Sequence, residues 1–176
     1  RSIDGFSQAL LDDYPDTLDE VGKDYLNRVR KASQKMAMLI DDMLDLSRVS
    51  RHELRREVLH ISAIADSIAQ KLMETDNNRS VTFTIEPGLE AEGDNRLVET
   101  ALDNLIGNAW KYTANRESAE IELGSTSRNG ETVFYVRDNG AGFDMKYASK
   151  LFGTFQRLHG SEFEGTGIGL ATVFRI

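Results

Sequence analysis

Apolar side chains in the first third of the chain recur at helical spacing. Between residues 18 and 49 they alternate in steps of four and three, the heptad pattern of helices that pack against other helices. The members of this seam are Tyr25, Val29, Ala32, Met36, Leu39, Met43 and Leu46. Leu26 and Ile40 widen the seam, which favours a bundle of more than two helices. An amphipathic helix that lies on its own domain is the alternative interpretation.

A shorter helix is predicted before the seam, over residues 1–13, with Ile3, Phe6 and Leu10 on one face. Pro15 then marks the turn between the two helices of a hairpin. The first helix would span roughly 20 Å and the second well over about 40 Å, so the two arms do not match. We therefore expect the first helix to begin upstream of Arg1, in a chain that is a fragment or a processed protein.

The pattern changes beyond residues 50–56, a polar and basic stretch that we interpret as a linker. Strand-like alternation and helical spacing then follow one another, and Asn129-Gly130 gives a strong hairpin signal. The predicted elements are a strand at 58–61, a helix capped by Ser62, a strand at 81–85, a helix from Asp94 to Thr113, and strands at 121–123 and 133–136. The sequence thus predicts an α+β chain, with a helical hairpin at 1–49 and a mixed sheet covered by helices at 57–176.

The helix predicted from Asp94 to Thr113 carries a polar stripe beside its apolar face. Asn104, Asn108 and Lys111 are spaced so that they project along one side. Amide oxygens and a lysine in a row can bind a hydrated magnesium ion and the phosphates that it neutralises. Taken alone, these three residues favour an ordinary solvated helix face over a binding site.

Two glycine-rich stretches follow this helix. In Asp138-Asn139-Gly140-Ala141-Gly142, a carboxylate at a strand end can accept a hydrogen bond from an adenine amino group, although a tight turn is the simpler interpretation. The stretch from Gly165 to Leu170 opens a final helix, where backbone N–H groups can bind phosphate. It lacks the Gly-Lys-Ser/Thr of a P-loop and the spacing of a dinucleotide-binding fingerprint.

Composition narrows the possible functions. The net charge of −8 indicates no nucleic-acid partner, because no basic surface dominates. Cysteine is absent, which excludes disulfides, thiolate metal sites and cysteine nucleophiles. The sequence holds no apolar run that could span a bilayer, so we expect no membrane contact by these residues and a cytoplasmic location, in a parent protein that could still be membrane-anchored.

The order of four short motifs is more specific than any one of them. They are Asn104-x3-Asn108-Ala109-x-Lys111, Asp138-x-Gly140-x-Gly142, Phe152-x2-Phe155 and Gly165-x-Gly167-x-Gly169. This series resembles the N, G1, F and G2 boxes of the ATP-binding domain of sensor histidine kinases, a GHKL (Bergerat) fold. The hairpin at 1–49 resembles the dimerisation and phosphotransfer domain of the same family. The motif sequences are most similar to those of phytochrome and PAS-linked kinases.

The resemblance implies a role for each matching residue. Asn108, with Asn104 beside it, would hold Mg²⁺ and the phosphates, and Lys111 and Arg157 would contact phosphate; Asn108, Lys111 and Arg157 would be the catalytic group. Asp138 would bind the adenine amino group. The remaining ATP-binding positions would be Tyr112, Gly140, Gly142, Phe155, Gly165, Thr166, Gly167, Ile168, Gly169 and Leu170. Residues 158–164 would form a short ATP lid.

The chain departs from the family pattern in two ways. Many members carry Gln or Glu where this chain has Thr100, and the adjacent Glu99 faces another way. The phosphoacceptor histidine is not in this sequence, whose histidines are His52, His60 and His159. Each of these three is expected to be a surface or structural residue.

The resemblance implies an ATP-dependent protein-histidine kinase that uses Mg²⁺ and works as a homodimer. It would pass the phosphoryl group from histidine to an aspartate of a response-regulator receiver domain. A GHKL-type ATPase and a non-catalytic ATP-binding dimerisation module are the alternatives. The heptad hairpin ahead of the nucleotide domain favours the kinase over the ATPase.

Overall fold

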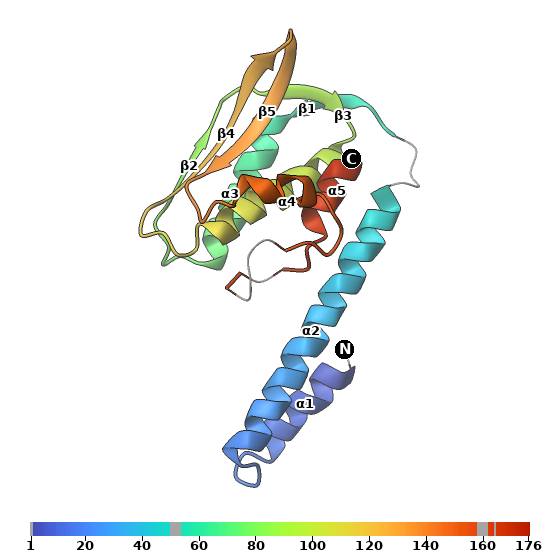
Figure 1. The fold of residues 1–176 in the computed structure, drawn as a ribbon, viewed down its shortest axis with the longest axis vertical. Helices are drawn as coiled ribbons and strands as arrows, with labels where there is room; N and C mark the ends of the chain where they lie inside the picture. The colour runs from blue at the N-terminus through green and yellow to red at the C-terminus, as the bar shows by residue number, and fades with distance from the viewer. Residues whose placement is uncertain (1, 50–53, 158–161, 164) are drawn as a thin grey trace. The chain divides into compact units, whose positions relative to one another are not determined.

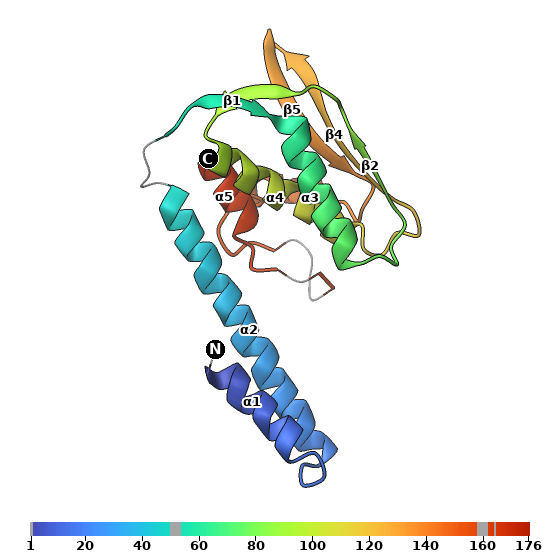
Figure 2. The same ribbon diagram turned by 180° about the vertical axis from the view of Figure 1, so that it is seen from behind.

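The structure is a computed structural model, and it describes residues 2–49, 54–157, 162–163 and 165–176 (Figures 1 and 2). It divides into two compact units, residues 1–47 and residues 48–176. Within the described part of the chain, no helix combines the length and the apolar character that crossing a membrane requires.

The first unit is the predicted helical hairpin. Helix α1 (Ser2–Asp13) lies alongside the first part of helix α2 (Glu20–Val49), as both views in Figures 1 and 2 show. The two helices are joined by polar contacts, because the Asp4 carboxylate accepts hydrogen bonds from Arg30 Nε and Gln34 Nε2, both at 3.1 Å. Ser7, also on α1, is buried. The hairpin and its turn therefore form as the sequence predicts.

Many large apolar side chains of the hairpin are exposed among the residues that the structure describes. On α1, Phe6 is 74% exposed, and on α2, Tyr25 is 60% exposed. Other large apolar side chains of the hairpin are also exposed, among them Ile3, Leu10, Val29, Met36 and Met43. Leu46 lies among the residues whose side chains the structure does not describe. The heptad seam is thus a helical face that the rest of the described hairpin leaves open to solvent.

The second unit contains two small sheets and the helices that cover them. Strands β1 (Glu57–His60) and β3 (Glu90–Gly93) form an antiparallel pair. Strands β2 (Val81–Ile85), β4 (Ala119–Arg128) and β5 (Glu131–Asp138) form a sheet in the order β2-β4-β5, parallel for β2 and β4 and antiparallel for β4 and β5. The helices are α3 (Ile61–Thr75), α4 (Asn95–Tyr112), the 3₁₀ helix η1 (Met145–Lys150) and α5 (Gly169–Arg175).

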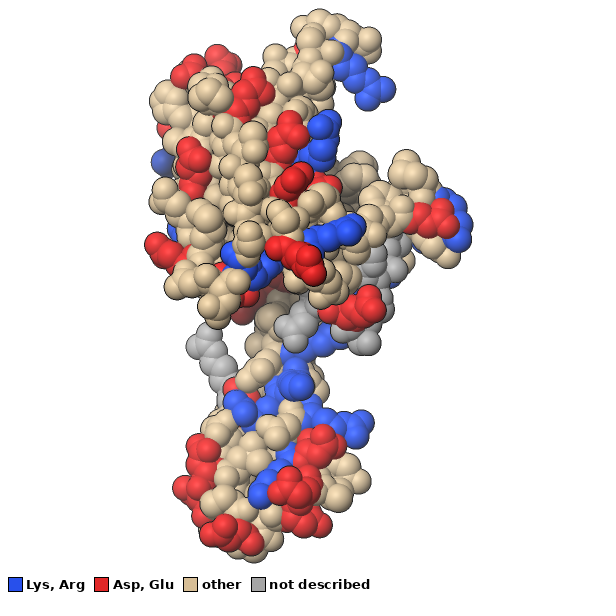
Figure 3. Space-filling model, turned by 90° about the vertical axis from the view of Figure 1, so that its left-hand side faces the viewer, with Lys and Arg blue, Asp and Glu red and all other residues tan. Residues whose placement is uncertain are grey.

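The core of this unit lies between α3, α4 and the strands. Its buried members are Leu59, Ile61, Ala65, Ile68, Leu89, Leu102, Ile106 and Leu123. Apolar residues of β2, β4 and β5 alternate with exposed polar ones, so the three-stranded sheet is covered on one face and open on the other. Acidic and basic side chains are interspersed over the side of this unit drawn in Figure 3. The predicted α+β class, with a mixed sheet covered by helices, is confirmed.

Local details confirm some predictions and correct others. Asp94 caps α4 as expected, and Asn129 and Gly130 turn the β4–β5 hairpin with φ angles of 55° and 84°. The predicted cap by Ser62 is wrong, because α3 begins one residue earlier, at Ile61. The Ser62 hydroxyl instead donates to the Glu86 carbonyl at 2.7 Å and accepts from the N–H of Leu89 at 2.9 Å. Strand β3 was not predicted from the sequence.

Candidate functional site

Helix α4 presents the predicted polar stripe because both its start and its inner face are fixed. At the N-terminus, the Asp94 carboxylate accepts hydrogen bonds from the N–H groups of Arg96 and Leu97. A further backbone hydrogen bond from Arg55, together with these, lowers the pKa of Asp94. On the inner face, Leu97, Leu102, Ile106 and Ala109 are buried. The helix can therefore turn only one side toward the glycine-rich segments.

The residues of this stripe make contacts of their own. Lys111 Nζ donates to Asn108 Oδ1 at 3.1 Å and lies 4.3 Å from the centre of the Tyr112 ring. Asn104 Nδ2 donates to the Thr100 carbonyl at 2.8 Å, which fixes the orientation of its amide group. The ammonium group and the amide oxygen of Asn108 thus lie together, as a phosphate and metal site would require.

The loop after β5 is held at three points. Asp138 Oδ1 accepts the N–H of Gly140 at 2.9 Å, which closes a tight turn at the strand end. The Asn139 amide continues the pairing with β4, because its Oδ1 accepts from the N–H of Glu120 at 3.0 Å and its Nδ2 donates to the Ser118 carbonyl at 3.1 Å. Asp138 therefore stands at a defined position at the end of the sheet.

The same loop meets the last turn of α4. The N–H of Ala141 donates to the Tyr112 carbonyl at 3.0 Å. A Cβ on Gly140 would stand 2.6 Å from that carbonyl oxygen, so only glycine permits this close approach. Arg116 Nη2 donates to the Gly140 carbonyl at 2.8 Å. The structure thus brings Tyr112, at the end of α4, next to the Asp138 loop.

The C-terminus of α4 is closed by residues that sequence analysis missed. Arg79, half-buried, donates to the Trp110 carbonyl at 3.0 Å and to Thr113 Oγ1 at 3.1 Å. Its guanidinium carbon also lies 4.2 Å from the centre of the Trp110 ring, which stacks on Phe83 at 6.1 Å. Thr113 is fully buried. Nothing in the sequence spacing links Arg79 to this helix end, so only the fold reveals the contact.

The C-terminal glycine-rich segment also lies against α4. A Cβ on Gly165 would stand 3.2 Å from Lys111 Nζ, and a Cβ on Gly169 would collide with the amide oxygen of Asn104. Gly167 has a φ of 76°, and its carbonyl accepts a hydrogen bond from the N–H of Phe155 at 2.9 Å. Ile168 is buried, so this residue can offer a ligand only its backbone. Thr166 and Leu170 are half-buried in the same segment.

Phe152 and Phe155, the two residues of the third motif, have different surroundings. The Phe152 ring lies 5.4 Å from that of Phe174, and Phe155 is 55% exposed. Arg157 Nη2 donates to the Phe163 carbonyl at 2.6 Å. Phe163 is buried, with its ring edge-on to Tyr112 at 5.2 Å.

Part of the predicted lid lies outside the described residues, namely 158–161 and 164, and so do His52 and His159. His60 is described and pairs with Glu90 at 3.0 Å across β1 and β3. Among the described residues, no cluster of His, Cys, Asp or Glu could hold a metal ion. A magnesium ion would therefore depend on amide oxygens and on ligands supplied by a nucleotide.

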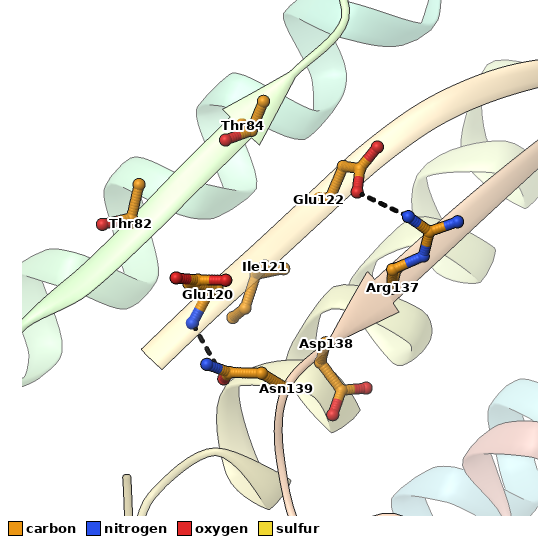
Figure 4. A pocket seen from close by; sticks show the side chains of 8 residues that line it. All are labelled: Thr82, Thr84, Glu120, Ile121, Glu122, Arg137, Asp138 and Asn139. Atoms are coloured by element: carbon orange, nitrogen blue, oxygen red, sulfur yellow. Dashed lines mark hydrogen bonds and ion pairs between the residues drawn. The ribbon is translucent and has the colours of Figure 1, made fainter. Parts of the chain in front are cut away.

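A cavity of about 300 Å³ lies on the sheet and is lined by Thr82, Thr84, Glu120, Ile121, Glu122, Arg137, Asp138 and Asn139 (Figure 4). Of the predicted site residues, Asp138 contributes to this lining. Glu122 accepts from Arg137 Nη1 at 3.2 Å and from the Tyr135 hydroxyl at 2.5 Å, and the latter hydrogen bond raises the pKa of Tyr135. Glu122, Tyr135 and Arg137 are therefore joined by hydrogen bonds on the open face of the sheet.

Comparison with known protein families agrees with this geometry. Residues 1–52 match the model of the His Kinase A (phospho-acceptor) domain, and residues 93–176 match that of the histidine kinase-, DNA gyrase B- and HSP90-like ATPases. The chain belongs to the histidine kinase family. The second match covers α4, the Asp138 loop and the C-terminal glycines, the segments that converge in the structure.

Curated relatives of this histidine kinase chain match it over nearly its full length. It is 35% identical to the methanogenesis regulatory histidine kinase FilI of Methanothrix harundinacea, over 99% of this chain and 20% of the relative. It is 31% identical to cyanobacterial phytochrome A of Nostoc, over 100% of this chain and 23% of the relative. The chain therefore spans less than a quarter of the length of these relatives.

Solved structures of histidine kinases share the fold. The crystal structure of full-length ShkA in complex with AMPPNP matches 98% of this chain and 36% of that one, with a TM-score of 0.64 and 22% identity. The Acinetobacter baumannii histidine kinase AdeS matches 99% of this chain and 81% of that one, with a TM-score of 0.62 and 20% identity. The roles of individual residues remain predictions.

Proposed function

We propose that this chain is the catalytic core of a two-component sensor histidine kinase, which binds Mg-ATP and transfers its γ-phosphoryl group to a histidine. From there the group would pass to an aspartate of a response-regulator receiver domain. One observation carries the proposal: α4 contacts both the Asp138 loop and the Gly165–Gly169 segment. These segments are far apart in the sequence and carry groups suited to the two ends of a nucleotide.

The residues at the end of α4 fit a nucleotide. Gly140 lacks the Cβ that would fill the space beside the Tyr112 carbonyl, and Asp138 lies at the same place with a carboxylate that can accept from an adenine amino group. Because Oδ1 already accepts the Gly140 N–H, Oδ2 is the oxygen that can bind the base. We assign the base pocket to Tyr112, Asp138, Gly140 and Gly142, with Phe155 at its edge.

The phosphate end would lie beside Asn104, Asn108 and Lys111. Lys111 Nζ lies 3.1 Å from Asn108 Oδ1 and next to Gly165. A positive charge, an amide oxygen and a glycine backbone are therefore close together. Mg²⁺, when bound, would neutralise the charge on the phosphates. Asn108 and Asn104 would hold the ion, and Lys111 and Arg157 would contact the phosphoryl group. Thr166, Gly167, Ile168, Gly169 and Leu170 would flank the triphosphate through their backbone.

We also assign the two units their functions. Residues 1–49 would be a dimerisation and phosphotransfer hairpin, residues 50–56 a linker, and residues 57–176 the ATP-binding domain. The exposed Phe6 and Tyr25 support a homodimer, because burying two such apolar faces against each other would complete a four-helix bundle. Sedimentation that finds only monomers, even with the first helix extended upstream, would count against this assignment.

Titration calorimetry with Mg-ATP tests the binding site. We expect Asn108→Ala and Asp138→Asn each to weaken binding roughly tenfold or more, the effect of losing one good polar contact. Asn77→Ala is the matched control, because Asn77 is exposed on the turn before β2. Unchanged ATP affinity in both site variants would show that the pocket is assigned wrongly.

Phosphotransfer is tested with radiolabelled ATP and a separate hairpin that bears the acceptor histidine. A kinase labels that partner on histidine, with an acid-labile, base-stable bond. A GHKL ATPase would release phosphate without labelling, and a non-catalytic module would bind ATP without either reaction. The chain alone should not label itself, because the acceptor histidine that the resemblance implies is not among its three histidines. Self-labelling that His159→Ala abolishes would contradict this mechanism.

A further inference from the structure

The side chain of Arg116 joins the turn after α4 to the glycine loop after β5, at Gly140. Its Nη2 donates to the Gly140 carbonyl at 2.8 Å. The backbone N–H of Arg116 in turn donates to the Thr113 carbonyl at 2.9 Å, so the residue is itself tied to the buried end of the helix. Arg116 is therefore a short bridge between a fixed point and the loop.

The bridge acts at the residue that Asp138 binds. Asp138 Oδ1 accepts the Gly140 N–H, and Arg116 holds the Gly140 carbonyl, so both polar groups of Gly140 are engaged. A guanidinium that donates to a carbonyl makes a charge-assisted hydrogen bond, which is stronger than a neutral one. If Arg116 is removed, Gly140 keeps only the Asp138 contact, and a glycine has more backbone freedom than any other residue.

We propose that Arg116 is a positioning residue that sets the base selectivity of the nucleotide site. It does so by holding the Gly140 peptide, which fixes the Asp138 carboxylate in the orientation that accepts the adenine amino group. This inference rests on the proposed function, because it assumes that Asp138 binds the base. Arg116 itself touches the loop and has no assigned contact with the nucleotide.

The test compares ATP with inosine triphosphate, which carries a carbonyl oxygen in place of the amino group. Removing an arginine also removes a positive charge, which weakens the binding of any triphosphate to a similar degree. The ratio of the two affinities cancels that general effect and reports only on recognition of the base. The variants are Arg116→Ala, Arg116→Lys, which can still donate to the carbonyl, and Arg128→Ala, which removes an exposed arginine at the far end of β4.

We expect the unaltered chain to prefer ATP, and Arg116→Ala to reduce that preference roughly three- to tenfold, the range of one lost hydrogen bond. Arg116→Lys should retain much of the preference, and Arg128→Ala all of it. Thermal unfolding of each variant shows that it is folded at the temperature of the titration.

The outcomes distinguish a failure of this inference from a failure of the proposed function. If the unaltered chain binds neither nucleotide, or binds both equally, the assignment of the base pocket fails and the role of Arg116 fails with it. If the chain prefers ATP and Arg116→Ala keeps the full preference, only the role of Arg116 is overturned. An equal loss of preference in Arg128→Ala would also overturn it, because a distant charge would then suffice.

Discussion

Gly169 lies directly against the side-chain amide of Asn104, so that a Cβ at position 169 would overlap the amide oxygen. The amide cannot move freely away, because its nitrogen donates to the Thr100 carbonyl at 2.8 Å. The start of α5 and the polar stripe of α4 are therefore fitted to each other. This packing requires that residue 169 has no Cβ.

Gly169→Ala should displace the Asn104 amide and weaken Mg-ATP binding roughly tenfold, the effect of one misplaced polar ligand. Titration calorimetry measures the change. Gly107→Ala is the matched control, since nothing lies within 4 Å of its new Cβ. That control should leave binding unchanged and stabilise α4 by about 0.5–1 kcal/mol. Full affinity in Gly169→Ala would show that Asn104 is not needed in its present position.

Asn139→Asp should destabilise the α/β unit by about 0.5–1.5 kcal/mol, the net contribution of one hydrogen bond at an exposed site. The new carboxylate can still accept the Glu120 N–H, but it cannot donate to the Ser118 carbonyl, which would face a negative charge. Chemical denaturation measures the loss. Asn77→Asp makes the same chemical change at an exposed turn and should have little effect. Equal stability of the two variants would refute the role of the Asn139 amide.

Arg79→Ala should lower the stability of the α/β unit by about 1.5–3 kcal/mol, because two hydrogen bonds from a charged donor are lost at the end of α4. The Trp110 carbonyl and the buried Thr113 hydroxyl would lose this donor. Arg128→Ala, at an exposed position, should change the stability by less than about 0.5 kcal/mol. Denaturation curves that superimpose for the two variants would contradict the prediction.

Asp103→Asn should stabilise the chain at neutral pH by about 0.2–0.5 kcal/mol, the effect of removing a like-charge pair on a helix. Burial and, after it, the Glu99 carboxylate raise the pKa of Asp103. The folded state therefore holds this proton more tightly than the unfolded state, and stability falls as the pH rises from the unfolded pKa of 3.8 through the raised value.

The advantage of Asp103→Asn should accordingly be absent below both pKa values and complete above them. Thermal unfolding across this pH range checks the sign. Asp66→Asn, at an exposed position on α3, serves as the control and should show no such growth with pH. A benefit that is largest in acid would contradict the assignment.

The helices and the site motifs could be predicted because their signals are local. The heptad seam and the Asn104–Lys111 stripe depend on spacing within one helix, which the backbone geometry fixes. Strand β3 was missed because Glu90-Ala91-Glu92-Gly93 lacks the β-branched and aromatic residues typical of strands; it forms by pairing with β1.

The contacts that brace the site could not be predicted from the sequence. Arg79 and Arg116 act on carbonyl groups of α4 and of the glycine loop, and which carbonyl each one reaches depends on the folded chain. Ser62 was assigned to a cap because serine favours that position, but the Glu86 carbonyl and the Leu89 N–H engage its hydroxyl across the fold. A tertiary partner outweighed a local preference here.

The stacking of Trp110 with Phe83 and with the Arg79 guanidinium gives the protein an internal optical probe. Trp110 is the only tryptophan in the chain, so emission excited at the red edge of protein absorption comes from this position. Lys111 and Tyr112 follow Trp110 directly in the sequence. A shift of the last turn of α4 therefore changes the electric field at the indole ring and its contacts with quenching groups. Binding at the proposed nucleotide site could then be followed in real time, without a label or a substitution.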